Sequence, residues 1–459
     1  MSHSYDTIAA QSTAPGAAAI GILRLSGPDA ISVAQACFRP LNKKPLSQHA
    51  PRTLVYGELL DRGGETIDWV LCTYTPGPNS YTGENTAEIQ CHGSPMVLSL
   101  GLEALFSAGA RQAGPGEYTR RAFLNGRLDL AQAEAVGDLL SARSREGARH
   151  AAGQLSGALS QKLGDVYSAL LDVMAHFHAV LDYPDEDIDP FRMEELEAAL
   201  TAQEAALSRL LATCRRGRQV TQGVSCAIVG QPNAGKSSLL NALAGFDRAI
   251  VTDIPGTTRD TIEHCVELGG LPLRLIDTAG LRQSDDPIEQ MGVERSRAAM
   301  EQAELIVVLC DQSAPFTQAD ADLLDMARSL APTILVWSKS DLPSAPVPVL
   351  NLPDDLPVVE LSAKTGEGLD ALEETIAALF PKGTDTPYGQ LLTNQRQEEA
   401  ATRARDSIRR AAQALRFGVT PDALLTDVEE ALSAMGELTG QSVREDITDR
   451  IFSRFCVGK

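Results

Sequence analysis

A glycine-rich octapeptide in the middle of the chain constrains the fold more than any other feature of the sequence. Residues 230–237 read Gly-Gln-Pro-Asn-Ala-Gly-Lys-Ser, and they follow the short apolar run from Val224 to Val229. A helical pattern from Ser238 to Leu243 comes directly after them. Glycines at this spacing let backbone N–H groups turn inward at a helix N-terminus and surround phosphate oxygens. The order of strand, loop and helix therefore predicts a Ras-like P-loop domain, which we place at residues 223–383.

Residues with the chemistry of nucleoside-triphosphate binding follow in the expected order. Lys236 supplies a positive charge between the β- and γ-phosphates, and the Ser237 hydroxyl is a ligand for Mg²⁺. Thr258, in a polar loop, can reach both Mg²⁺ and the γ-phosphate. Asp277 and Gly280 follow the apolar run at residues 271–276, where the carboxylate approaches Mg²⁺ through its ligands and the glycine N–H senses the γ-phosphate.

The next two apolar runs end in residues suited to a guanine base. Asp341 can accept hydrogen bonds from N1–H and the 2-amino group, a donor pair that adenine lacks. Ser338 stands where GTPases usually carry asparagine, so we expect weaker nucleotide affinity with selectivity retained. The predicted nucleotide contacts are Asn233, Ala234, Gly235, Lys236, Ser237, Ser238, Thr252, Asp253, Ile254, Pro255, Gly256, Thr257, Thr258, Asp277, Thr278, Ala279, Gly280, Ser338, Lys339, Ser340, Asp341, Ser362, Ala363 and Lys364.

The sequence lacks the glutamine with which Ras-like enzymes orient the attacking water. Leu281 occupies that position and cannot do so. Asn233 offers an amide oxygen that can coordinate a monovalent cation beside the phosphates. Glu289 is a second candidate, either as a catalytic carboxylate or as a solvated loop residue.

The segments on either side of the P-loop domain have different predicted secondary structure. Residues 1–122 read as mixed strand and turn, and they predict a small α/β domain. Apolar residues between 155 and 181 recur every three or four positions, and further helical runs lie at 193–214, 395–417 and 421–438. We therefore expect a helical domain in two parts, 123–222 and 384–459, interrupted by the inserted P-loop domain.

The bulk composition limits the environment and the partners of the chain. The formal net charge is −21, so its overall field repels nucleic acid, and RNA would need local basic patches or a second protein. Arg120-Arg121 and residues 215–218 are either such patches or solvated helix ends. No signal peptide or membrane-spanning run is evident, and eight scattered cysteines indicate buried thiols, so we expect a cytoplasmic protein.

Beyond the P-loop set, the chain resembles the MnmE (also TrmE) family of tRNA-modification GTPases along essentially its whole length. The N-terminal blocks and the C-terminus are the specific part of this resemblance. The blocks that carry it are residues 21–24 (GILR), 76–84 (PGPNSYTGE), 121–134 (RAFLNGRLDLAQAE), 254–260 (IPGTTRD), 277–282 (DTAGLR) and 450–459 (RIFSRFCVGK).

The resemblance implies an architecture and a mode of GTP hydrolysis. Family members have an N-terminal folate-binding domain that forms a constitutive homodimer, a split helical domain, and an inserted GTPase domain. Hydrolysis is activated by K⁺, which on this sequence Asn233 and backbone groups of Thr252, Ile254 and Thr257 would hold. Glu289 matches the catalytic glutamate that aligns the water.

The resemblance also implies the chemistry and the partners. With an FAD-containing partner, MnmG, the family forms an aminomethyl or carboxymethylaminomethyl group at C5 of the wobble uridine (U34) of certain tRNAs. A heterotetramer with this partner is expected, and the partner would hold much of the tRNA. The one-carbon unit comes from a tetrahydrofolate derivative (5,10-methylene or 5-formyl), contacted on this sequence by Arg24, Glu84, Arg127 and Lys459.

Two questions stay open at the level of sequence. Cys456 is either a nucleophile toward uracil C6 or a structural thiol near the folate pocket, since no neighbouring histidine is evident to lower its pKa. The competing functions are a ribosome-assembly or RNA-binding switch GTPase and a scaffold that binds GTP without hydrolysing it. The acidic chain shows no basic RNA-binding module of the kind that such switch GTPases usually append.

Overall fold

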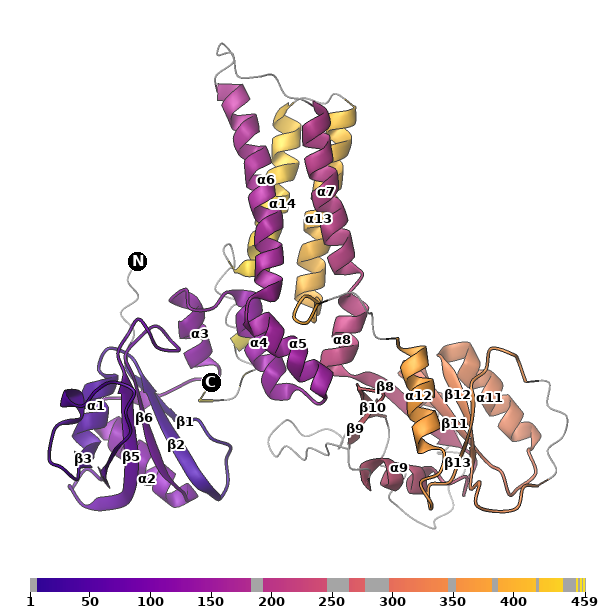
Figure 1. Cartoon of the computed structure of the whole chain (residues 1–459), viewed down its shortest axis with the longest axis horizontal. Helices are drawn as coiled ribbons and strands as arrows, with labels where there is room; N and C mark the ends of the chain where they lie inside the picture. The colour runs from indigo at the N-terminus through magenta and orange to yellow at the C-terminus, as the bar shows by residue number, and fades with distance from the viewer. Residues whose placement is uncertain are drawn as a thin grey trace. The chain divides into compact units, whose positions relative to one another are not determined.

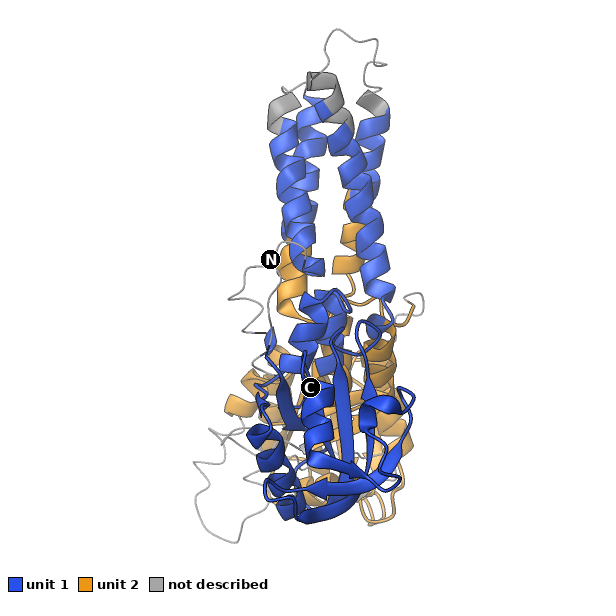
Figure 2. Ribbon diagram, turned by 90° about the vertical axis from the view of Figure 1, so that its left-hand side faces the viewer, with its two compact units in different colours: residues 1–137, 154–203, 403–459 blue, residues 138–153, 204–402 orange. Residues whose placement is uncertain are grey.

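The computed structural model describes residues 6–182, 193–245, 264–276, 297–345, 352–381, 387–417, 421–440, 451, 452, 455, 457 and 458. The chain divides into two compact units, each assembled from separate stretches of sequence (Figure 2). One unit comprises residues 1–137, 154–203 and 403–459, and the other comprises 138–153 and 204–402. Among the residues described here, no helix is both long and apolar enough to cross a membrane.

The N-terminal residues form a seven-stranded sheet in the order β3-β4-β5-β6-β2-β1-β7 (Figure 1). Neighbouring strands are antiparallel except β1 and β7, which run parallel. The strands are β1 (Ile8–Gln11), β2 (Ala18–Ser26), β3 (Phe38–Pro40), β4 (Val55–Leu60), β5 (Thr66–Thr75), β6 (Thr86–Gly93) and β7 (Arg111–Gln112). The expected small α/β domain is thus present.

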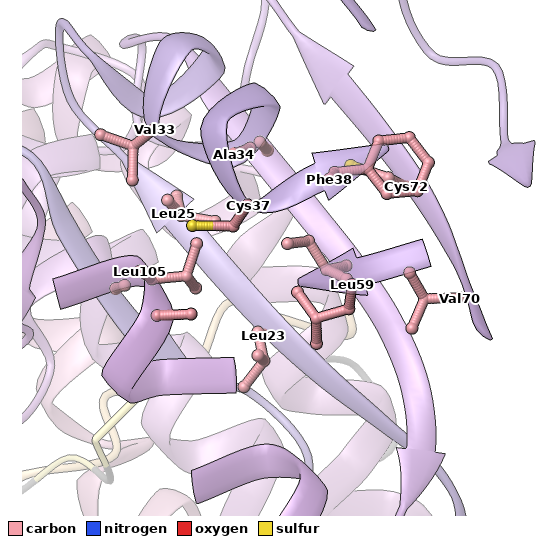
Figure 3. Packing of buried hydrophobic residues seen from close by; sticks show 14 of the residues in the cluster. Leu23, Leu25, Val33, Ala34, Cys37, Phe38, Leu59, Val70, Cys72 and Leu105 are labelled. Atoms are coloured by element: carbon pink, nitrogen blue, oxygen red, sulfur yellow. The ribbon is translucent and has the colours of Figure 1, made fainter. Parts of the chain in front are cut away.

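Two helices and a short 3₁₀ turn bury one face of this sheet. They are α1 (Ala30–Cys37), α2 (Pro95–Ser107) and η1 (Leu46–Gln48). Every second residue of the central strands faces them, as in Leu23 and Leu25, which pack against Val33, Cys37 and Leu105 (Figure 3). This alternation is what the pleat of a half-buried sheet requires.

The rest of the first unit, as far as the structure describes it, is mainly helical. The periodic stripe predicted from residue 155 to 181 is divided by a turn at residues 156 and 157: Leu155 ends α5 (Arg145–Leu155), and the rest lies on α6 (Ala158–Asp182). Among the side chains of α6 that the structure describes, the buried members of the stripe are Leu159, Leu163, Val166, Leu170 and Val173. α6 packs against α14 (Pro421–Thr439). The other helices of this region are α3 (Glu117–Leu124), α4 (Leu130–Ser141), α7 (Met193–Leu211) and α13 (Gln395–Arg416). α7 ends three residues before the predicted limit, and α8 (Cys214–Gln222) begins after the turn at Thr213.

The second unit contains a six-stranded sheet in the order β13-β12-β11-β8-β10-β9. All neighbouring strands run parallel except β9 and β10. The strands are β8 (Val224–Gly230), β9 (His264–Leu268), β10 (Leu271–Leu275), β11 (Leu305–Asp311), β12 (Thr333–Ser338) and β13 (Val358–Leu361). Such a sheet needs cover on both faces.

Two separate apolar clusters supply that cover. Val307 and Leu309 of β11 pack with α9 (Lys236–Gly245) and α12 (Leu369–Leu379), whereas Ile306 and Val308 pack with α11 (Gln318–Leu330). Successive residues of one strand therefore belong to different cores, which defines a doubly wound α/β domain with its loops at the carboxyl ends of the strands.

Two segments connect this sheet to the rest of its unit. One is helix α8, which leads into β8, and the other is the segment around residues 389–392, which returns to helix α5 (Arg145–Leu155) and to the start of α8. α8 passes into β8 through Gly223, whose φ of 81° is in the left-handed region. The returning segment bonds to α5 through Gly389 N–H, which donates to His150 Nδ1 at 3.2 Å. Leu392 N–H donates to Thr213 Oγ1 at 3.2 Å. A Cβ on Gly217 of α8 would lie 1.9 Å from the Leu392 carbonyl oxygen, so only glycine permits this approach.

Candidate guanine-nucleotide site and a second polar cavity

The phosphate-binding loop takes its shape from Gly230 at the end of β8 and from Asn233 and Gly235 in the connection to α9. Asn233 and Gly235 have φ values of 62° and 94°, in the left-handed region that asparagine tolerates and glycine favours. At Gly230 a Cβ would lie 2.4 Å from the Leu309 carbonyl oxygen, so any larger residue would push β8 away from β11. The loop therefore turns sharply enough for α9 to begin at Lys236, with its N-terminus directed at the loop.

Lys236 reaches back over this loop. Its Nζ donates to the carbonyl oxygens of Gly230 and Gln231 at 2.7 and 2.9 Å. Burial lowers the pKa of Lys236. An ammonium group has three donors, so one N–H stays available for a phosphate oxygen.

A cavity of about 260 Å³ adjoins the loop. It brings together three segments far apart in the chain: the start of α9, the residues after β12 and the residues after β13. Its lining comprises Gly235, Ser238, Leu239, Leu309, Ser338, Lys339, Asp341, Leu342, Leu361, Ala363 and Lys364. Seven of these residues are among the nucleotide contacts predicted above, so the structure brings this part of the predicted set together at one cavity.

The carboxylate of Asp341 has a fixed partner. The Ser362 hydroxyl donates to Asp341 Oδ1 at 2.8 Å and accepts from the Thr365 N–H at 3.2 Å. Ser362 is fully buried and does not itself line the cavity, so its side chain orients Asp341 from behind. The sequence analysis included Ser362 among the predicted nucleotide contacts but did not predict this side-chain hydrogen bond to Asp341.

Ser338 bonds to the phosphate-binding loop in spite of its short side chain. Its buried hydroxyl donates to the Ala234 carbonyl oxygen at 2.6 Å, with the Cys310 carbonyl oxygen at 3.2 Å. Serine at this position thus connects β12 to the phosphate-binding loop directly. The weaker nucleotide affinity expected for serine in place of asparagine stays a prediction.

Lys339 spans the edge of the same cavity. Its Nζ pairs with Asp311 Oδ2 at 2.6 Å, and its φ of 59° turns the chain at the end of β12. Burial acts to raise the pKa of Asp311, but hydrogen bonds from Lys339 and Ser313 outweigh it, and the pKa is lowered. The ion pair holds the lysine stem along the cavity wall.

Several predicted site residues lie outside the described part of the chain. They are Thr252, Asp253, Ile254, Pro255, Gly256, Thr257, Thr258, Asp277, Thr278, Ala279, Gly280 and Glu289. The predicted cation ligands that are described, Asn233 and Ser237, are both exposed beside the loop.

A second polar cavity, of about 370 Å³, lies in the N-terminal sheet. Arg52, Arg127 and Glu88 are among its lining residues. Glu88 pairs with Arg24 across 2.9 Å, so two of the predicted folate contacts belong to this region. Thr73 Oγ1, at the same cavity, is buried without a hydrogen-bond partner in the described structure.

The C-terminus lies against the same domain. Val457 forms a bridge with Pro115, and the Ser12 hydroxyl donates to the Gly458 carbonyl oxygen at 3.1 Å. Cys456 and Lys459 themselves are outside the described residues.

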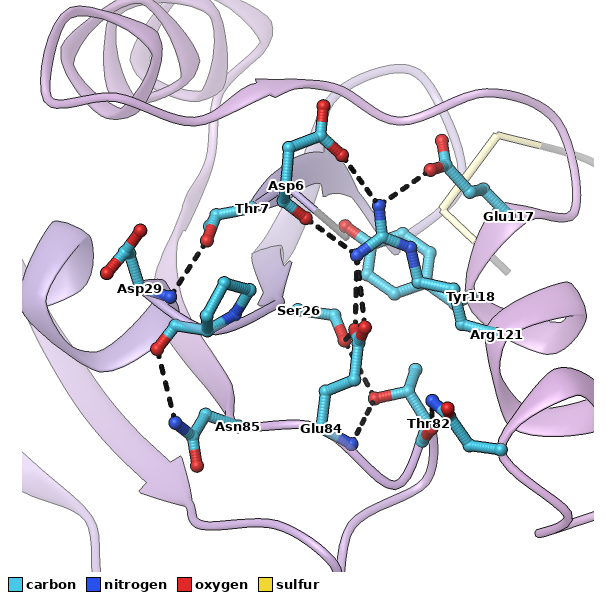
Figure 4. A network of polar contacts seen from close by, with 12 residues as sticks. Asp6, Thr7, Ser26, Asp29, Thr82, Glu84, Asn85, Glu117, Tyr118 and Arg121 are labelled. Carbon is cyan, nitrogen blue, oxygen red and sulfur yellow. Dashed lines mark hydrogen bonds and ion pairs between the residues drawn. The ribbon is translucent and has the colours of Figure 1, made fainter. Parts of the chain in front are cut away.

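Glu84, the remaining predicted folate contact, does not line this cavity. Its carboxylate accepts hydrogen bonds from Ser26 and Arg121 (Figure 4). Arg121 had been expected in a surface patch or at a solvated helix end, but its exposed fraction is 1%. It lies on the buried face of α3 with Tyr118 and Ala122, at the i, i+3 and i+4 spacing that could have identified it.

The fold and the site define the class of this protein. A doubly wound sheet with a P-loop after β8 and a carboxylate at the base cavity is the arrangement of a GTPase. Residues 7–127 match the family model described as the GTP-binding protein TrmE N-terminus, and residues 130–456 match the MnmE helical domain. The chain belongs to the family of tRNA modification GTPases MnmE.

Individual relatives agree along the whole chain. The tRNA modification GTPase MnmE of Chloroflexus aurantiacus is 46% identical over 458 residues, covering 99% of this chain and 100% of that one. The Roseiflexus sp. enzyme of the same name is 43% identical over 464 residues, covering 99% of each chain. Among solved structures, the G domain of the T. maritima FeoB iron transporter is 27% identical over 34% of this chain and 97% of that one, with a TM-score of 0.24.

Proposed function

We propose that this chain is the K⁺-activated GTPase of a wobble-uridine modification complex. With an FAD-containing MnmG-type partner it forms the 5-carboxymethylaminomethyl or aminomethyl group on U34 of certain tRNAs, using a one-carbon unit from tetrahydrofolate. The observation that carries the proposal is the assembly of Gly235, Ser338 and Asp341 around one cavity in a chain related over its full length to tRNA modification GTPases.

The described residues suit GTP and Mg²⁺. Asp341 accepts from the guanine N1–H and 2-amino groups, and the third Lys236 donor meets the phosphates. Ser237, in the first turn of α9, would hold Mg²⁺ together with Thr258. Magnesium supplies charge neutralisation on the phosphates.

The proposed K⁺ site begins at Asn233. Its left-handed backbone and exposed side chain leave the amide oxygen free to face the nucleotide side of the loop. Thr252, Ile254 and Thr257 would add backbone ligands, and Glu289 would align the attacking water indirectly. K⁺ supplies the positive charge that an arginine finger provides in other GTPases.

The N-terminal domain has features that suit a folate. Arg24, Arg127, Glu84 and Lys459 are the proposed contacts, and the glutamate tail of the ligand favours guanidinium groups such as Arg52 and Arg127 at the polar cavity. The buried Thr73 hydroxyl there lacks a partner among the described residues, which a bound polar ligand would supply. Tetrahydrofolate supplies the one-carbon unit when bound.

The proposal extends to assembly and location. The chain would act in the cytoplasm as a homodimer through its N-terminal domains and join the FAD protein in a heterotetramer. The net charge of −21 favours a tRNA held largely by that partner. We place the domain boundaries at 1–122, 123–222, 223–383 and 384–459.

GTP hydrolysis by the purified chain in matched KCl and NaCl tests the proposal. We expect K⁺ to accelerate turnover strongly over Na⁺, and Asn233→Ala to remove most of that difference while nucleotide binding persists. Equal rates in the two salts for the unaltered chain would refute the K⁺-activated mechanism.

A further inference from the structure

A fully enclosed arginine lies at the centre of the polar network in the N-terminal domain. Arg121 projects from α3, and only 1% of its surface is exposed. Its Nη1 donates to the Asp6 carbonyl oxygen at 2.7 Å and to Glu84 Oε2 at 3.1 Å. Its Nη2 donates to Glu117 Oε1 at 2.8 Å and to Asp6 Oδ1 at 3.1 Å (Figure 4). A buried guanidinium is stable only when it is paired in this way.

The three carboxylates around Arg121 do not depend on it equally. Asp6 and Glu117 both pair with a second cation, Arg111, at 2.6 Å each. Burial acts to raise the pKa of Glu117, but hydrogen bonds from Arg111, the Gly114 N–H and Arg121 more than offset it and lower the pKa to about 2. Within the described part of the chain, Arg121 is the one cation that Glu84 contacts. Glu84 is therefore the carboxylate whose ion pair, among the described residues, is with Arg121 alone.

Glu84 is also held in one orientation. Its Oε2 accepts from the Ser26 hydroxyl at 2.7 Å as well as from Arg121, and Ser26 lies 2.7 Å from the Thr82 hydroxyl. Its Oε1 accepts one long bond, 3.3 Å from Arg121 Nη1. A carboxylate oxygen has two acceptor positions, so Oε1 retains one for a ligand.

We propose that Arg121 is a positioning residue that holds the Glu84 carboxylate in the orientation that receives the amidine-like edge of a pterin. This inference rests on the proposed folate site. The planar fork of arginine contacts Glu84, Glu117 and both the carbonyl and the carboxylate of Asp6, a set of contacts that the three donors of a lysine ammonium cannot all replace. Arg121 acts through Glu84 and does not itself contact the ligand.

Calorimetric titration of the full chain with 5-formyltetrahydrofolate tests this inference. We expect Glu84→Gln and Arg121→Lys each to weaken binding about tenfold or more, because each removes a charge-assisted contact. In Arg121→Lys/Glu84→Gln the affinity should be no lower than in Glu84→Gln alone. Glu117→Gln is the matched control: it removes another Arg121 partner and lowers thermal stability, but it should change the affinity less than twofold.

The outcomes separate the inference from the proposed function. If the unaltered chain does not bind the folate, the folate site is wrong. If it binds and Arg121→Lys binds equally well, or the double substitution is additive, the positioning role is overturned. Should Arg121→Lys not fold, Ser26→Ala removes the other contact that orients Glu84. If Ser26→Ala binds the folate with unchanged affinity, the orientation of Glu84 does not govern folate binding.

Discussion

The Asp341 carboxylate combines selectivity with a fixed orientation. Ser362 holds one oxygen at 2.8 Å, and the side chain borders the cavity beside the phosphate-binding loop. Two adjacent donors on guanine match two carboxylate oxygens, so the proposed site would discriminate by hydrogen-bond pattern rather than by size. Selectivity should therefore change when the acceptor oxygen becomes a donor, without loss of the fold.

Asp341→Asn tests this at the scale of one residue. The amide donates where the carboxylate accepted, so we expect GTP affinity to fall at least tenfold and xanthosine triphosphate to become the better ligand. Competition binding with GTP, xanthosine triphosphate and ATP measures the change. If Asp341→Asn still preferred GTP, Asp341 would not be the residue that recognises the guanine base.

A second residue, His150, makes the free energy of unfolding depend on pH. Its Nδ1 accepts the Gly389 N–H, and the ring meets Tyr388 edge-on with centroids 5.0 Å apart. Burial lowers the pKa of His150, opposed by Glu146 and assisted by Arg216. The folded state therefore favours the neutral ring, and its contribution is complete above about pH 6.5 and is lost as pH falls through the lower folded pKa.

We predict that Tm falls between pH 7.5 and 5.5 by more in the unaltered chain than in His150→Asn. Asparagine keeps an acceptor near the position of Nδ1 but does not titrate. Differential scanning calorimetry at both pH values gives the comparison, and parallel pH profiles would remove His150 as the titrating group.

At the scale of elements, two helical glycines should respond in opposite ways to the same substitution. Gly217 of α8 faces the Leu392 carbonyl oxygen, 1.9 Å from an added Cβ, whereas Gly164 of α6 has nothing within 4 Å. Gly217→Ala should cost about 2 kcal/mol or more through overpacking against backbone. Gly164→Ala should stabilise by about 0.5–1 kcal/mol through helix propensity. Thermal unfolding of both variants decides this, and a neutral Gly217→Ala would show that α8 does not hold the returning segment.

Local pattern predicted the elements well where a single period dominates. The stripe ending near Leu181 corresponds to α6, and the apolar runs around the octapeptide correspond to β8, β10 and β12. Arg121 was placed wrongly because charge was given more weight than its position on the helix. The i, i+3, i+4 spacing of Tyr118, Arg121 and Ala122 places Arg121 on the buried face of α3. The partners that stabilise its buried charge include residues distant in sequence, such as Asp6, which a local pattern does not reveal.

At the scale of the whole molecule, the sites are built from segments that only the fold brings together. The strand-loop-helix motif predicted where phosphate binds, but the contacts of Ser338 with Ala234 and of Ser362 with Asp341 depend on parallel strand order. The bridge between Val457 and Pro115 joins the end of the chain to the N-terminal domain. The spacing of apolar residues along the sequence does not predict such long-range contacts.

The proposed function makes the GTPase domain a regulator of chemistry at the folate domain and the partner. Its most direct test is nucleoside mass spectrometry of tRNA from cells that lack the gene for this chain. We predict that the 5-substituted wobble uridines disappear, return with the unaltered chain, and do not return with Lys236→Ala, which removes the phosphate contact. Unchanged wobble uridines in the deletion strain, or full restoration by Lys236→Ala, would contradict GTP-dependent tRNA modification.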